Sequence, residues 1–432
     1  MIIALRYFLL FLCAKFASAD LLSVHVITRH GDKNPAYELP YSDKIPYNGE
    51  LLRTGKQRLA NIGETMRKLY LNNTPIPDHF EDGKFYFRST PYSRTKESLL
   101  SYTYGFFPPG TGPKLNEKFV FPEGIQPIPI HSVDENSETL LLGCSFCPNS
   151  LKAAVDQFST PEFKTFWNNN KDTFNEIFDL VGVHPEGLHI LDIMDSVKSV
   201  ILSQDPKYPL PEKMTDELAN KAKSLSNQLM KIVLPTWDKE YCKAASGKIA
   251  NEIFFTNMNS DIYSLNKDKN AIVPRYRHYS CHDLSLLAIS GCFGLDMKEN
   301  DIFPEYASLL VVEAHTDNEH NLSNPQIVFK YEFNPPLDGA IKLTEFVPSF
   351  CDSKKKCDLQ TLQSYWKDVS NAIKSNDWDT SICGFQTRPP PSKSNSSYLI
   401  VGFIVLAVSF VLCLVAIALV MIRRYKHSKR CC

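Results

Sequence analysis

Three largely apolar segments of this chain are each followed by a helix, and this alternation limits the fold more than any other feature. LLSVHVIT (21–28) has the continuous apolar character of a buried strand, and FYFRST (85–90) and RYRHYSC (275–281) are predicted as two further strands. Apolar residues at helical spacing predict helices over 53–70, 93–107 and 284–290. Strands that alternate with helices predict an α/β fold with a mostly parallel central sheet flanked by helices.

The middle of the chain lacks this alternation. Between residues 150 and 247 it is dominated by helix-like stretches such as DELANKAKSLSNQLMKIV, with few strand signals. We therefore predict a smaller helical domain inserted into a larger α/β domain. The predicted bounds are 20–149 and 248–385 for the α/β domain and 150–247 for the helical insertion.

Both ends of the chain are typical of targeting segments rather than of a folded core. Residues 1–19 combine an early arginine, an apolar stretch and small residues before Asp20, which predicts a signal peptide. The apolar run 398–422 exceeds the roughly 20 residues that a helix needs to cross a membrane, and basic residues follow it within 423–432. With a Pro/Ser-rich stalk at 386–397, these segments predict a single-pass type I membrane protein of the secretory pathway with a lumenal or extracellular ectodomain.

Cysteines and sequons agree with that compartment. Of the twelve cysteines, eight lie between the predicted signal peptide and the predicted transmembrane helix, and an even number there predicts disulfides. Asn72, Asn321 and Asn395 begin sequons and are predicted glycosylation sites. The formal net charge of -1 argues against a nucleic-acid partner, because no overall positive field exists to hold a phosphate backbone.

Polar and charged residues follow each predicted strand directly. They are Arg29, His30, Asp32 and Lys33 after the first strand, Arg88 and Arg94 around the end of the second, and His282 and Asp283 after the third. Because the carboxyl ends of parallel strands meet at one edge of a sheet, we expect these side chains to converge on one crevice. Helix N-termini at the same edge would add N–H groups that favour an anion.

This set of side chains suits phosphate chemistry. Arginine can bind two phosphate oxygens with its planar fork, and lysine supplies a point charge. A histidine among cations tends to stay neutral and nucleophilic even at mildly acidic pH, so its attack on phosphorus would give a phosphohistidine. The cations would stabilise the charge on the equatorial oxygens, and a carboxylic acid at Asp283 or Asp32 would protonate the leaving group.

Two motifs resemble those of the histidine acid phosphatases. RHGDKNP (29–35) is similar to their RHGxRxP signature, and YSCHD (279–283) to their His-Asp motif. The similarity covers roughly residues 21–385, including the segment NDIFPEYASLL, and is strongest to the animal prostatic and lysosomal members. The resemblance implies a phosphate monoester hydrolase without a cofactor or metal, in which His30 is the nucleophile, Asp283 is the general acid, and Arg29, Arg94 and His282 hold the phosphate, with Lys33 as a further phosphate ligand.

The resemblance also implies features outside the two motifs. It pairs Cys147 with Cys383 and Cys351 with Cys357, and it implies homodimerisation, which is common among the animal members. Leu309 stands where the family has a cysteine of its third bridge, so the pairing of the remaining cysteines stays open: Cys144, Cys242, Cys281 and Cys292. The tail lacks the tyrosine sorting signal of the lysosomal members, which favours the plasma membrane over the lysosome.

Lys33 is the main departure from the family pattern, since it replaces the second arginine of the signature. Lysine keeps the charge but loses the fork, so contact with two phosphate oxygens becomes a single contact. Loss of one charge-assisted hydrogen bond of about 1.5–3 kcal/mol in the transition state would lower the rate roughly ten- to a hundred-fold. An alternative is therefore a catalytically weak or inactive membrane glycoprotein that uses the same fold for binding.

Two further alternatives concern other classes of protein. A metal-dependent phosphatase would use His30, Asp32, His282 and Asp283 as ligands, but the surrounding cations argue against divalent metal binding. A structural or adhesive ectodomain would require repeats or surface patches, and the sequence contains no internal repeat. The hydrolase is the favoured interpretation.

Overall fold

The computed structural model describes residues 20–71, 74–203, 208–316, 322–351 and 357–386. The predicted signal peptide, the predicted transmembrane helix and the three predicted glycosylation sites lie outside these ranges. Within them, no helix is both long enough and apolar enough to cross a bilayer. All helices and strands named below belong to the compact unit that ends at Gly384.

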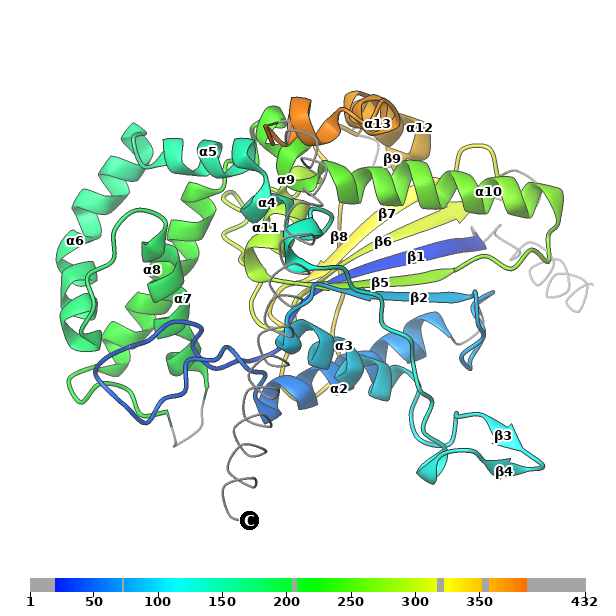
Figure 1. Cartoon of the computed structure of the whole chain (residues 1–432), viewed down its shortest axis with the longest axis horizontal. Coiled ribbons are helices and arrows are strands. Elements are labelled where there is room, and N and C mark those ends of the chain that lie inside the picture. Colours follow the sequence, from blue (N-terminus) through cyan, green and yellow to red (C-terminus); the bar gives the residue numbers. More distant parts are fainter. Residues whose placement is uncertain (1–19, 72–73, 204–207, 317–321, 352–356, 387–432) are drawn as a thin grey trace, which may run out of the picture. The chain divides into compact units, whose positions relative to one another are not determined.

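A seven-stranded sheet forms the centre of the fold (Figure 1). Its strands are β1 (Asp20–Arg29), β2 (Phe85–Ser89), β5 (Tyr276–Cys281), β6 (Leu309–Thr316), β7 (Gln326–Glu332), β8 (Thr344–Phe346) and β9 (Cys357–Asp358). The order is β2-β5-β1-β6-β7-β8, with β9 paired to β7. A separate two-stranded sheet joins β3 (Lys114–Leu115) to β4 (Lys118–Phe119).

The three strands predicted from the sequence form the parallel part of the sheet. β5 pairs in parallel with β1 on one side and with β2 on the other, so the carboxyl ends of all three share one edge. From β6 onward the strands pair antiparallel, and the sequence analysis did not identify these strands. The predicted α/β class is confirmed.

Helices cover both faces of the sheet (Figure 1). α2 (Arg53–Tyr70) and α3 (Ser93–Phe106) lie on one face, and α9 (Lys239–Asn251), α10 (Met258–Lys267) and α11 (Asp283–Cys292) lie on the other. Two further helices near the end of the described chain are α12 (Leu359–Tyr365) and α13 (Lys367–Lys374). Short 3-10 and π segments are η1 (Pro122–Gly124), η2 (Glu135–Ser137), η3 (Glu252–Asn257) and η4 (Trp378–Ile382).

The core between α2, α3 and the sheet follows from the apolar spacing of α2. Leu59, Ile62 and Met66 recur at intervals of three and four residues and are all buried. They belong to one core cluster with Val24 and Val26 of β1, whose alternate side chains face the same side of the sheet. Each fully buried apolar side chain contributes about 1.5–3 kcal/mol, so this face holds α2 against the sheet.

The middle of the chain is helical, as its sequence pattern indicates. It contains α4 (Gly143–Phe146), α5 (Pro148–Gln157), α6 (Pro161–Val181), α7 (His189–Leu202) and α8 (Asp216–Val233). The side chains of Thr160 and Thr215 cap the N-termini of α6 and α8, and Gly182 ends α6 at a positive φ of 79°. Helices α5 to α8 gather beyond one end of the sheet (Figure 1), and their status as a separate inserted domain stays a prediction.

The described chain contains three disulfides. Cys147 is bonded to Cys383, Cys351 to Cys357, and Cys242 to Cys292. The first two join cysteines that the resemblance pairs, whereas the third joins two cysteines that the sequence analysis left unassigned. Cys144 and Cys281 are buried free thiols.

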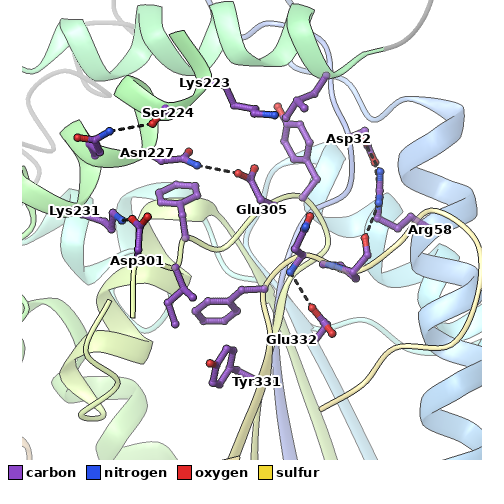
Figure 2. Close-up of a pocket in the computed structure, with 18 residues that line it drawn as sticks. Asp32, Arg58, Lys223, Ser224, Asn227, Lys231, Asp301, Glu305, Tyr331 and Glu332 are labelled. Carbon is purple, nitrogen blue, oxygen red and sulfur yellow. Dashed lines mark hydrogen bonds and ion pairs between the residues drawn. The ribbon is translucent and has the colours of Figure 1, made fainter. Parts of the chain in front are cut away.

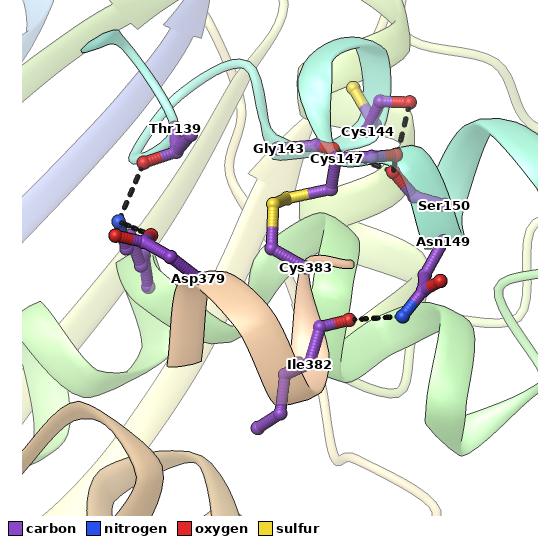
Figure 3. Close-up of a disulfide and its surroundings, with 10 residues drawn as sticks. Thr139, Gly143, Cys144, Cys147, Asn149, Ser150, Asp379, Ile382 and Cys383 are labelled. Atoms are coloured by element: carbon purple, nitrogen blue, oxygen red, sulfur yellow. Dashed lines mark hydrogen bonds and ion pairs between the residues drawn. A yellow bond between two sulfur atoms is a disulfide. The ribbon is translucent and has the colours of Figure 1, made fainter. Parts of the chain in front are cut away.

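The Cys147–Cys383 disulfide joins the turn between α4 and α5 to the segment after η4 (Figure 3). Two hydrogen bonds from Asn149 join the same two segments. Asn149 donates from its backbone N–H to Cys383 O at 3.0 Å and from its side-chain amide to Ile382 O at 2.9 Å. Of the three disulfides, Cys147–Cys383 closes the largest loop, with a sequence separation of 236 residues.

Removing this disulfide is expected to destabilise the protein more than removing the short one. Loop-closure entropy predicts a loss of about 5 kcal/mol for the Cys147→Ser/Cys383→Ser double variant and about 2 kcal/mol for Cys351→Ser/Cys357→Ser. The free energy of unfolding, measured in urea for both variants, checks this. Equal losses would contradict the loop-length explanation.

Candidate active site

A pocket of about 550 Å³ lies at the carboxyl edge of the parallel strands. Five of the six residues that the resemblance places in the active site line it: His30, Lys33, Arg94, His282 and Asp283. The sixth, Arg29, has no exposed side-chain surface and contacts Asp283 from within the fold. The sheet thus brings together residues from three distant segments of the chain.

The turn after β1 depends on close backbone packing. His30 donates its backbone N–H to Cys281 O at 3.0 Å, which ties the ends of β1 and β5 together. At Gly31 a Cβ atom would lie only 2.7 Å from the Cα of Gly55, in the first turn of α2. A side chain at position 31 would therefore push the turn away from α2, which explains why glycine follows the histidine.

His30 is held as a neutral imidazole. Its Nδ1 lies 2.9 Å from Gly31 O, and because a carbonyl oxygen only accepts, Nδ1 carries the proton and Nε2 keeps its lone pair. Burial, followed by the charges of Arg94 and Arg29, holds the pKa of His30 well below 6.5. The imidazole therefore stays uncharged in mildly acidic solution.

Arg29 and Asp283 form a buried ion pair beside His30. Arg29 Nη2 lies 2.7 Å from Asp283 Oδ2, and Asp283 Oδ1 accepts the backbone N–H of Leu284 at 2.8 Å. Asp283 is the first residue of α11, where the helix dipole favours a negative charge. Burial alone would raise the pKa of Asp283, but Arg29 and Lys33 outweigh it and the pKa lies below its usual value.

His282 and Arg94 form a second pair in the pocket. Arg94 Nη2 donates to His282 Nδ1 at 3.2 Å, so His282 carries its proton on Nε2 and donates it to Thr90 Oγ1 at 2.9 Å. Burial, and then Arg94 and Arg29, lower the pKa of His282 well below 6.5. The guanidinium of Arg94 also lies over the ring of Tyr92, 4.7 Å from its centroid.

Three residues that the sequence analysis did not identify complete the site. Asp195 and Ser199 of α7 lie 2.8 Å and 3.1 Å from Lys33 Nζ, and the ring of Tyr306 lies 5.9 Å from that of His30. Asp195 and Ser199 belong to no motif, so nothing in the sequence near them marked them. Tyr306 lies in NDIFPEYASLL, and the family likeness of that segment was a signal that could have identified it.

Two charged residues of the predicted clusters point elsewhere. Asp32 is bound by Arg58, with contacts of 3.0 Å and 3.1 Å to its two oxygens, and does not line the pocket of His30. Arg88 binds both oxygens of the buried Glu138, at 3.0 Å and 2.9 Å. With Asp32 bound to Arg58 and Asp283 bound to Arg29, the four residues of the metal-dependent alternative do not form a ligand set.

A second pocket of about 550 Å³ contains Asp32, Glu305 and Tyr306 but neither His30 nor Asp283 (Figure 2). Several of its charged groups are already paired. Arg58 binds Asp32, and Lys231 lies 2.6 Å from Asp301. Glu305 accepts from Asn227 and lies 2.7 Å from Lys198 Nζ. These pairs leave this pocket less suited to an anion than the pocket of His30.

The chain is similar to known acid phosphatases along most of its length. It is 27% identical to the prostatic acid phosphatase of Mus musculus over 323 residues, which cover 72% of this chain and 79% of the relative. It is 23% identical to the lysosomal acid phosphatase of Xenopus laevis over 386 residues, 88% of this chain and 82% of the relative. The fold is similar to that of the phytase from Citrobacter braakii, with a TM-score of 0.54 at 12% identity, over 81% of this chain and 98% of that chain.

The profile of the histidine phosphatase superfamily (branch 2) matches residues 45–334. The match spans two of the three segments that meet in the pocket, those that carry Arg94 and His282–Asp283. Its length, together with the acid phosphatases among the relatives, supports hydrolysis of phosphate monoesters. The chain belongs to the histidine phosphatase superfamily, branch 2, and is a phosphoric monoester hydrolase.

Proposed function

We propose that this protein is an acid phosphatase that hydrolyses phosphate monoesters through a phosphorylated His30. The observation that carries the proposal is the hydrogen bond from His30 Nδ1 to Gly31 O, which leaves the lone pair on Nε2. His30 lines a pocket together with Lys33, Arg94 and Asp283. A neutral nucleophile, cations for the phosphate and a carboxyl group for the leaving group are the parts that the reaction needs.

In the first step, His30 Nε2 attacks phosphorus and the bond from phosphorus to the ester oxygen breaks. Arg29 and Arg94 stabilise the charge on the equatorial oxygens, with His282 held beside them by Arg94. Asp283 gives its proton to the leaving alkoxide, so that the products of this step are an alcohol and phosphohistidine.

Asp283 must be protonated to act in this way, although its pKa in the ligand-free site lies below the usual value. A bound phosphate raises the pKa of Asp283 in two ways. It interacts with Arg29 and so weakens the ion pair of Arg29 with Asp283, and it places negative charge near the carboxylate. A monoanionic ester brings one proton with it. In the second step, Asp283 takes a proton from water, whose oxygen attacks phosphorus and releases His30 and inorganic phosphate.

The relatives and the cysteines support the proposed cellular location. Relatives of the lysosomal and prostatic types and three disulfides in the described chain support the secretory pathway. We propose that the described part lies in the lumen or outside the cell, anchored by residues 398–422 at the plasma membrane. Homodimerisation and the glycan sites stay predictions.

A pH profile on an aryl phosphate tests the proposed function. Because the pKa of His30 lies well below 6.5, the fraction of neutral histidine does not fall when the solution is acidified through pH 6.5. Activity of the purified full chain is therefore expected to persist at about pH 5, to survive a chelator and to be blocked by vanadate. Loss of half the activity on acidification to pH 6.5 would contradict the neutral, buried nucleophile. Loss of activity with a chelator would restore the metal-dependent alternative.

Lys33→Arg is expected to raise kcat/KM about tenfold. The guanidinium fork can keep one contact to Asp195, which now lies 2.8 Å from Lys33 Nζ, and offer a second donor to a phosphate oxygen. Steady-state kinetics of the variant and the wild type measure the change. An unchanged or lower kcat/KM would show that Lys33 does not limit the reaction.

A further inference from the structure

Lys33 is fully occupied by protein acceptors. Its Nζ lies 2.8 Å from Asp195 Oδ2, 3.1 Å from Ser199 Oγ and 3.4 Å from Asn34 O. An ammonium group has three N–H donors, and these three acceptors match them. The residue is 2% exposed, so no further partner reaches it without displacing one of the three. Asn34 O is backbone and Ser199 is held by other bonds, which leaves the carboxylate of Asp195 as the group to displace.

The carboxylate of Asp195 also contacts Arg29. Asp195 Oδ1 lies 3.5 Å from Arg29 Nη2, the nitrogen that binds Asp283 at 2.7 Å. The side chain of Asp195 is 15% exposed and lines the pocket together with His30 and His282. One carboxylate from α7 thus bridges Lys33 and Arg29 inside the pocket that would receive the phosphate.

A hydrogen-bond network joins the backbone of Asp195 to Lys33. Ser199 lies one helical turn after Asp195 on α7 and donates from Oγ to the Asp195 carbonyl at 2.8 Å. With its proton used in this way, Ser199 Oγ accepts from Lys33 and from the Tyr306 hydroxyl, which lies at 2.8 Å. The helix, the lysine and the tyrosine beside His30 are therefore coupled through one hydroxyl group.

The charge balance of the site depends on Asp195. Arg29, Lys33 and Arg94 supply three positive charges, Asp195 and Asp283 supply two negative charges, and the low pKa of each histidine leaves it neutral. A third carboxylic acid, Asp192, also lines the pocket, and burial raises its pKa. Whatever the charge of Asp192, the site has one more net positive charge without Asp195 than with it. A phosphate anion is bound more tightly by the site without Asp195, because that site has the more positive net charge.

We infer that Asp195 is an internal competitor for phosphate, whose carboxylate occupies Lys33 and Arg29 until a substrate phosphate displaces it. This inference rests on the proposed function, because it assumes that phosphate binds in the pocket of His30. It makes Asp195 a residue that sets affinity rather than a catalytic one. The competition weakens binding of substrate and of product phosphate alike, so KM is raised and product inhibition is reduced.

The test compares Asp195→Asn with the wild-type full chain and with Asp301→Asn. The control also removes one negative charge from an Asp–Lys ion pair, that of Asp301 with Lys231 at 2.6 Å, outside the pocket of His30. Calorimetry measures the Kd of inorganic phosphate at about pH 5.5, and kinetics on an aryl phosphate give kcat and KM. Asp195→Asn is expected to bind phosphate about tenfold more tightly and to show a KM lower by a similar factor, with kcat changed less than threefold. Asp301→Asn is expected to match the wild type.

A third variant separates charge from structure. Asp195→Glu keeps the charge and is expected to bind phosphate as weakly as the wild type, whereas equal gains in Asp195→Glu and Asp195→Asn would overturn the role of charge. If the wild type binds phosphate and Asp195→Asn binds it equally or less tightly, Asp195 supports the site instead of competing in it. If no variant binds or turns over phosphate esters, the proposed function fails as well. Thermal unfolding of each variant identifies any loss that comes from misfolding.

Discussion

His30→Ala is expected to lower phosphatase activity by about 10⁴-fold or more. The alanine variant lacks the neutral imidazole whose Nε2 keeps its lone pair free. His282 is also neutral, but its lone pair on Nδ1 accepts from Arg94. The cations remain, so inorganic phosphate should still bind with an affinity close to that of the wild type. A large loss in kcat with little loss in phosphate affinity is the signature of a missing nucleophile rather than of a damaged pocket.

Chemical trapping gives a second measurement of the same prediction. The wild type, mixed with a substrate labelled on phosphorus and quenched in alkali, is expected to retain label on His30, because a phosphohistidine survives alkali. His30→Ala should retain none. His79→Ala is the matched control, since His79 is an exposed surface histidine paired with Asp78 and Glu81. Label or activity that persists in His30→Ala would show that another residue is the nucleophile.

The part of the site that could be predicted from sequence is the part built on parallel strands. The ends of β1, β2 and β5 meet at one edge whatever the length of the connections, so local motifs at strand ends were enough to bring His30, Arg94 and Asp283 together. Asp32 shows the limit of this reasoning. Asp32 follows β1, as His30 does, but its partner Arg58 lies on α2. Only the packing of α2 decides which way the Asp32 carboxylate turns.

The contribution of the helical segment could not be predicted. Asp195 and Ser199 reach Lys33 because α7 packs near the turn after β1, and the position of α7 depends on tertiary contacts that leave no local pattern. The sequence shows that Lys33 replaces the arginine of the family signature, but it does not show that Asp195 binds Lys33. The Cys242–Cys292 disulfide could not be predicted for a related reason. It joins α9 to the end of α11, and no sequence motif indicates that these two helices are in contact.

Asp283→Asn is expected to lower kcat by about 10²–10⁴-fold, with the larger loss on alkyl phosphates. An alkoxide needs a proton in order to leave, whereas nitrophenolate leaves without one, so the first step on nitrophenyl phosphate should be little affected. The second step still needs a base to take a proton from water. Phosphohistidine should therefore accumulate in Asp283→Asn with nitrophenyl phosphate, seen as a burst of one nitrophenolate per site followed by slow turnover.

The control for Asp283→Asn is Asp261→Asn, which alters another buried Asp–Arg pair. Asp261 lies 2.7 Å and 2.8 Å from the two Nη atoms of Arg277, outside the pocket of His30. Leaving an arginine without its buried carboxylate destabilises a fold in either place, so both variants should unfold at lower urea concentration than the wild type. Only the Asp283 variant should distinguish alkyl from aryl substrates, because in the proposed mechanism only Asp283 exchanges a proton with the reacting oxygens. Equal losses on both substrate classes without a burst would mean that Asp283 holds Arg29 in place and that the proton comes from elsewhere.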